Sequence, residues 1–185
     1  MSFVVKKESD WQFVTSSTGG LGVEFVGLEG GMIWLQDPAR QSEAFGYGAA
    51  GIGITEGLKV PKIGKVQLKV RGKGVGGVIA PASFPNTGKV YVLETFAGDE
   101  LTASDIRGVC VFCEVYGGAI AGGSATAMIF GMSPVWLGLA IAAGPLGPIA
   151  MMKLIETATG VLLMAGVNAG IQAGVGAGVF LGALF

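Results

Sequence analysis

The chain contains no histidine, only two cysteines and very little charge in its last third. The lack of histidine excludes Ser-His-Asp and Cys-His catalysis and histidine-containing zinc sites. Only Lys153 and Glu156 carry charge after Glu114, and because they are three apart they can pair with each other on a helix. A net charge of −1 indicates neither nucleic-acid binding nor a strongly charged partner. Because no nucleophile–base pair, metal cluster or cofactor loop is evident, we expect no enzymatic activity and no cofactor.

The two cysteines form a Cys110-x-x-Cys113 spacing within VCVFCEV, a sequence typical of a strand. Redox-active pairs with this spacing normally begin a helix, whose dipole lowers a thiol pKa. On a strand, residues three apart point to opposite faces. We therefore interpret both as buried structural cysteines.

The first eleven residues, MSFVVKKESDW, lack the long apolar core and the small-residue cleavage site of an export signal. We therefore expect synthesis in the cytoplasm without Sec export. The hydrophobic C-terminal region must then be hidden, or must insert into a membrane by itself.

Alternating apolar and polar residues predict strands in residues 1–132. In residues 63–71, Val66, Leu68 and Val70 face one way and basic or polar residues face the other. Further strands are predicted at 89–96, 109–116 and 124–130, the last two as a pair joined through glycines. Short strands with glycine-rich turns predict an antiparallel sandwich or barrel.

The pattern changes at Ser133-Pro134, a typical helix start with a hydroxyl at the N-cap and proline next. Residues 135–143 predict a helix of about ten residues, 144–148 a glycine–proline interruption, and 148–185 a second helix. The predicted fold is thus α+β, with a β domain over 1–132 and a hydrophobic helical hairpin over 133–185. Residues 124–143 are an alternative first spanning helix, although Pro134 near their centre argues against it.

The second predicted helix carries a ladder of glycines at every fourth position: Gly166, Gly170, Gly174, Gly178 and Gly182. Each glycine inside a helix in water costs about 0.5–1 kcal/mol relative to alanine. In lipid the same glycines allow two helix backbones to approach closely. We therefore predict a transmembrane helix that packs through this glycine zipper.

Asn168 and Gln172 lie four apart in the same segment, nearly opposite the glycine stripe on a helix. Amides that face lipid are costly, so both should face another helix or water. They line an uncharged pore if several copies assemble, or they bond neighbouring helices without a conducting role. Both interpretations remain open.

A basic run includes Lys65, Lys69, Arg71 and Lys73. These side chains are candidates for contact with anionic lipid headgroups, each worth about 1 kcal/mol near such a surface. The alternative is a solvated strand face or a guard on an edge strand. Asp99, Glu100 and Asp105 follow no partner pattern, and we assign them no role.

The Gly166–Gly182 ladder and the hydrophobic run from Val135 give an architecture that resembles the small pore-forming effectors of bacterial type VI secretion. The resemblance implies loading inside the haemolysin-coregulated protein ring of the secretion tube. It also implies delivery to a rival's periplasm, insertion into the inner membrane of that cell, and a cognate membrane immunity protein in the producer.

The resulting hypothesis is a non-enzymatic antibacterial toxin whose partner is the lipid bilayer. It would form homo-oligomers in the membrane, act as an ion channel and dissipate ion gradients. Two other classes remain: a structural protein whose glycine ladder packs within a multimer, and a tail-anchored binding module. Only the toxin predicts leakage across a bilayer; the structural protein and the binding module do not.

Overall fold

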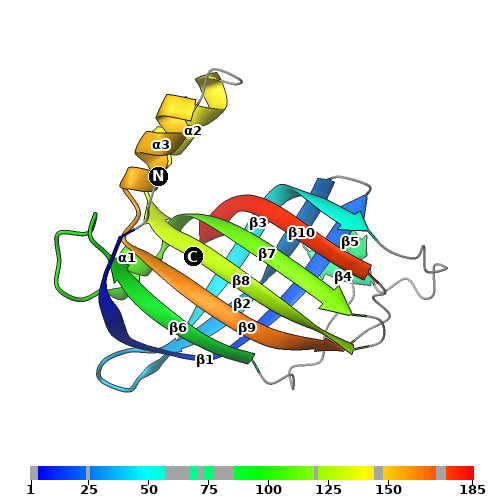
Figure 1. Cartoon of the computed structure of the whole chain (residues 1–185), viewed down its shortest axis with the longest axis horizontal. Helices are drawn as coiled ribbons and strands as arrows, with labels where there is room; N and C mark the ends of the chain where they lie inside the picture. Colours follow the sequence, from blue (N-terminus) through cyan, green and yellow to red (C-terminus); the bar gives the residue numbers. More distant parts are fainter. Residues whose placement is uncertain are drawn as a thin grey trace.

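The computed structural model describes residues 4–23, 26–56, 67–70, 73–76, 86–118, 121–143, 148–169 and 174–185. Eight of the strands form a closed antiparallel barrel in the order β1-β2-β3-β10-β7-β8-β9-β6 (Figure 1). The barrel strands are β1 (Val5–Val23), β2 (Val26–Gln36), β3 (Ser42–Glu56), β6 (Asn86–Leu93), β7 (Gly108–Gly118), β8 (Ala121–Met132), β9 (Gly160–Ala169) and β10 (Gly174–Leu184). A separate two-stranded sheet pairs β4 (Gln67–Val70) with β5 (Lys73–Gly76).

The predicted strand pair around the cysteines is confirmed as β7 and β8, with Phe112 paired to Met128. Strand alternation places Cys110 in the barrel interior, where burial raises the pKa of its thiol to about 12. Cys113 lies on the opposite face and is exposed, so the interpretation of two buried cysteines is wrong for this residue. The Cys110 thiol therefore acts as a small buried hydrophobic group.

The predicted fold class, with its C-terminal hydrophobic helical hairpin, is wrong. A helix does begin at Pro148, but α3 (Pro148–Glu156) ends after nine residues, and the chain continues as β9 and β10. These two strands complete the barrel, since β10 pairs with β3 and β7, and β9 with β8 and β6. None of the helices in the described ranges has the length and hydropathy that crossing a bilayer requires.

A repeat of four residues explains the error. Four is close to the helical period of 3.6, but it is also a multiple of two, the period of a strand. In β10, Gly178 lies on the buried face with Phe180 and Leu184, whereas Ala177 and Val179 are exposed. Glycine is a poor helix former, and β-branched residues such as Val179 suit a strand.

Two helices rise from one end of the barrel (Figure 1). The predicted start at Ser133-Pro134 is confirmed by α2 (Pro134–Ala143), and the predicted Lys153–Glu156 pair is present in α3 at 2.6 Å. Leu154 is fully buried against the barrel residues Val109 and Met132. This contact fixes α3 on the barrel end.

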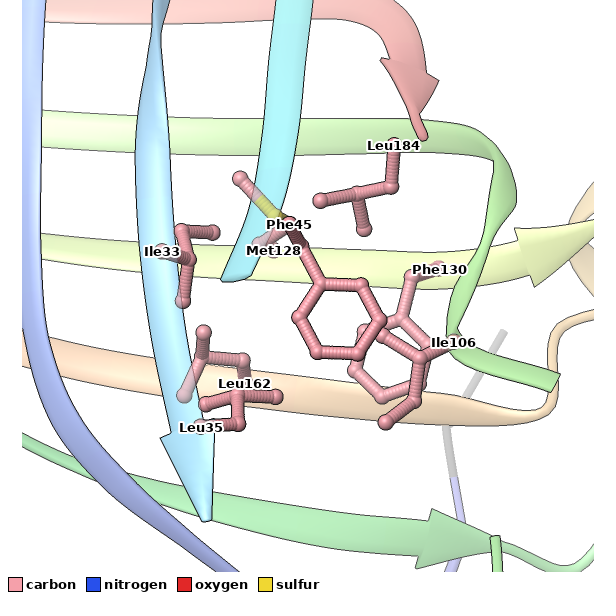
Figure 2. A pocket seen from close by; sticks show the side chains of 8 residues that line it. All are labelled: Ile33, Leu35, Phe45, Ile106, Met128, Phe130, Leu162 and Leu184. Atoms are coloured by element: carbon pink, nitrogen blue, oxygen red, sulfur yellow. The ribbon is translucent and has the colours of Figure 1, made fainter. Parts of the chain in front are cut away.

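The main core fills the barrel interior at this same end. Eight strands enclose a space just wide enough for side chains to fill. Its members are large and apolar, with Phe45, Phe130 and Leu35 at most 1% exposed. The short helix α1 (Ala103–Ile106) adds Ile106 to this core from a loop at the barrel end (Figures 1 and 2).

Candidate functional site

Four neighbouring strands, β10, β7, β8 and β9, present an uncharged outer surface. Val115, Val179 and Leu163 are 56%, 51% and 44% exposed on it. Soluble proteins rarely expose contiguous apolar patches larger than a few hundred Å², and larger ones mark interaction sites. We name as the apolar outer face the exposed residues Cys113, Val115, Ala125, Leu163, Ala165, Ala177, Val179 and Ala183.

Strands β1 and β6, of which β6 pairs with β9, have a different character. On β1 and β6 the exposed side chains include Glu8, Asp10, Gln12 and Lys89. Lys89 donates to Glu8 at 2.9 Å between the two strands, and this contact raises the pKa of the lysine. Among the side chains that the structure describes, the exposed ones on β10, β7, β8 and β9 are thus apolar, whereas those on β1 and β6 include charged ones. The two surfaces meet where Lys89 of β6 pairs with Leu163 of β9.

Inside the barrel, aromatic rings separate the apolar core from a more polar region. Phe112 stacks on Phe180 with centroids 4.8 Å apart, and Tyr47 meets Phe112 edge-on at 5.8 Å. Glu114 follows Phe112 on the inward side of β7, between Gly178 and Thr126 on the neighbouring strands. Burial raises the pKa of the Glu114 carboxyl, which has no hydrogen bond or ion pair with any described residue.

At the helix end, Glu100 holds a loop against β1. Its carboxylate accepts hydrogen bonds from Lys7 Nζ at 2.8 Å, from the Ser9 hydroxyl, and from the backbone N–H groups of Asp10 and Leu101 at 3.1 and 3.0 Å. Partial burial favours a higher pKa for Glu100, but these four donors outweigh it and lower the pKa to about 2. The carboxylate is therefore ionised, and satisfied, at neutral pH.

We expect Glu100→Gln to lower the free energy of unfolding at pH 7 by about 1–3 kcal/mol, because charge-assisted hydrogen bonds are lost. A lowered folded-state pKa gives stability that is present above the unfolded pKa and is lost as the pH falls toward 2. The difference from the unaltered protein should therefore shrink between about pH 4.5 and pH 2. Denaturant titrations at several pH values measure it.

Glu8→Gln provides the control, since its ion pair with Lys89 is exposed to solvent and should contribute little to stability. Equal losses for both variants at pH 7 would contradict a special role of Glu100.

The predicted site residues fall in several places. Gly166 and Asn168 lie in β9, where Asn168 pairs with Gly122, and Gly174, Gly178 and Gly182 lie in β10. All five are therefore in strands, so the helical zipper and the helical face shared by Asn168 and Gln172 lose their basis. Lys69 is in β4 and Lys73 in β5, while Gly170, Gln172, Lys65 and Arg71 lie outside the described residues. Contact with headgroups stays a prediction.

Sequence reasoning missed the apolar outer face and Glu100. The first had a signal, because Val175, Ala177, Val179, Leu181 and Ala183 alternate with smaller or inward residues. Glu100 had none, since its partners at Lys7, Ser9 and Asp10 lie about ninety residues earlier in the chain. Such a contact arises only when the barrel closes.

Comparison with known proteins gives one strong similarity. No family model matches the chain, and no solved structure matches it. The chain is 45% identical over 184 residues to the Toxin protein Tse4 of Pseudomonas aeruginosa, and the alignment covers 96% of this chain and 94% of that protein.

Proposed function

Because the chain belongs to the family of the toxin protein Tse4, we propose that it is an antibacterial toxin that permeabilises membranes. The proposal that the protein permeabilises membranes rests on the apolar outer face. Burying apolar area away from water contributes about 25 cal/mol per Å², so a face this apolar gains free energy against lipid. No charged side chain on it opposes that transfer.

The distribution of charge around the barrel determines which strands contact the lipid. The charged strands β1 and β6 lie next to each other in the barrel, away from β10 and β7, and β6 borders β9, so Lys89 lies at the edge of the proposed contact beside Leu163. Charged side chains are expensive in hydrocarbon. We therefore propose that β10, β7, β8 and β9 meet the lipid first and that β1 and β6 stay in water.

The test is leakage of an encapsulated dye and of ions from vesicles. We expect Val179→Asp and Val115→Asp each to reduce the leakage rate at least tenfold, because an aspartate at the membrane centre costs about 2.5–3.5 kcal/mol and 1.4 kcal/mol is a factor of ten. Both side chains are exposed, so the melting temperature should hardly change.

Gln12→Asp is the matched control, because it places the same charge at an exposed position on β1. Its leakage should equal that of the unaltered protein. Normal leakage from all three variants would remove the apolar outer face from the mechanism, and no leakage from the unaltered protein would overturn the proposed function.

The second candidate is a structural role, in which the apolar outer face packs against other copies. This role predicts large oligomers in water, which Val179→Asp would dissociate. It also predicts no leakage from vesicles. Light scattering and leakage on the same sample distinguish the two.

The route to the target belongs to the same proposal. Following the resemblance to type VI effectors, the toxin is made in the cytoplasm, loaded into the secretion-tube ring and delivered to a rival cell. There it acts at the inner membrane, dissipates ion gradients and needs no enzymatic step. A cognate immunity protein protects the producer, and its deletion should make the producing strain sensitive to its neighbours.

A further inference from the structure

One end of the barrel is closed by a loop with a short helix. Residues 95–107, which we call the plug, include α1 and follow β6 at this end (Figure 1). Leu101 and Ile106 of the plug are 3% and 1% exposed, and Phe96 and Ala103 also pack against the barrel core. The plug is thus part of the interior packing although it belongs to no strand.

Polar contacts tie the plug to β1 and β3. Three donors to Glu100 come from β1, the indole N–H of Trp11 donates to the Leu101 carbonyl at 2.7 Å, and Lys6 Nζ lies 3.5 Å from the Asp99 carboxylate. At the other end of the plug, Arg107 pairs with Glu43 of β3 at 2.9 Å. Polar contacts can exchange for water at modest cost, unlike the strand ladders around them. The plug is therefore the part of this end that can leave without opening the barrel wall.

The packing beneath the plug is incomplete. A cavity of about 10 Å³ lies between Ile106 and the barrel, lined only by apolar side chains such as Phe45, Phe130 and Leu184 (Figure 2). Ile106 points into it from the plug, whereas the other lining residues come from the strands. Ile106 is 1% exposed and borders this void, so the plug buries it without filling the barrel end completely.

Withdrawal of the plug would uncover the apolar interior at this end. Water does not accommodate that surface, but lipid does. We infer that the plug is an autoinhibitory element, held by Glu100 against β1, which must leave the barrel before the protein permeabilises a bilayer. This inference rests on the proposed function and adds its regulation.

The plug can be locked by a cross-link that leaves Glu100 intact. Lys6→Cys with Asp99→Cys replaces an exposed ion pair between β1 and the plug, and a short reducible bis-maleimide joins the two thiols. All proteins in this experiment carry Cys113→Ala, which removes the exposed native thiol and keeps that position apolar, while Cys110 is buried. Each leakage rate is compared with that of the Cys113→Ala protein without further substitutions. The matched control is Glu8→Cys with Lys89→Cys, which joins β1 to β6 without touching the plug.

Each cross-linked protein is added to vesicles before and after reduction. We expect the locked plug to bind vesicles normally but to leak at least tenfold more slowly, with recovery on reduction, and the control cross-link to leak normally throughout. Glu100→Gln without any cross-link should leak severalfold faster than the unaltered protein.

The outcomes separate the inference from the proposed function. Rapid leakage with an intact plug cross-link overturns the inference and leaves the proposed function standing. Equal loss for both cross-links also overturns it, because then the barrel wall itself must open. If the unaltered protein causes no leakage from any vesicle, both the inference and the proposed function are overturned.

Discussion

Replacing Phe45 by alanine is expected to lower the free energy of unfolding by about 3–5 kcal/mol. The Phe45 side chain is fully buried, its ring meets Trp11 edge-on at 5.9 Å, and the Arg107 guanidinium lies 5.1 Å from its centroid. The ring also borders the interior cavity, so truncation would enlarge an existing void rather than allow neighbours to close in. A closed barrel wall cannot collapse easily around that void.

Denaturant unfolding measures this loss, and Phe185→Ala is the matched control. Phe185 is the same residue type but 69% exposed, so its truncation should cost less than about 1 kcal/mol. Similar small losses for both variants would show that the barrel end is not packed around Phe45.

Much of the β architecture follows from local pattern. The alternation in VCVFCEV predicts β7, and the glycines after it predict the turn toward β8. Ser133-Pro134 predicts the start of α2, and the three-residue spacing of Lys153 and Glu156 predicts their ion pair. These features depend on neighbours in sequence, so the sequence alone suffices.

The errors come from features that depend on distant residues. The glycine ladder fits a helix in lipid and one face of a strand equally well, and only pairing with β3 and β7 decides between them. Glu100 follows no local pattern, because three of its four donors come from β1. The apolar outer face, likewise, exists only because β10, β7, β8 and β9 become neighbours.

Gly182→Ala is expected to destabilise the protein by about 3 kcal/mol or more. Gly182 pairs with Ala49 across β10 and β3, and a Cβ added to it would overlap the backbone oxygen of Gly48 and lie 2.5 Å from the Ala49 Cβ. Backbone atoms in a strand pair cannot move aside without breaking hydrogen bonds between the strands. The loss of stability therefore includes both the overpacking and the broken hydrogen bonds.

The control is Gly48→Ala on the adjacent strand, where an added Cβ meets nothing within 4 Å. Its stability should change by no more than about 0.5 kcal/mol. Whether Gly182→Ala raises or lowers the free energy of unfolding then tests whether the glycine ladder lies in a helix or in a strand. In an isolated helix in water, alanine in place of glycine would raise stability by about 0.8–1 kcal/mol, whereas in β10 it must lower it. A stabilised Gly182→Ala protein would therefore contradict the barrel, and a destabilised one beside a neutral Gly48→Ala would establish that the ladder serves close strand packing.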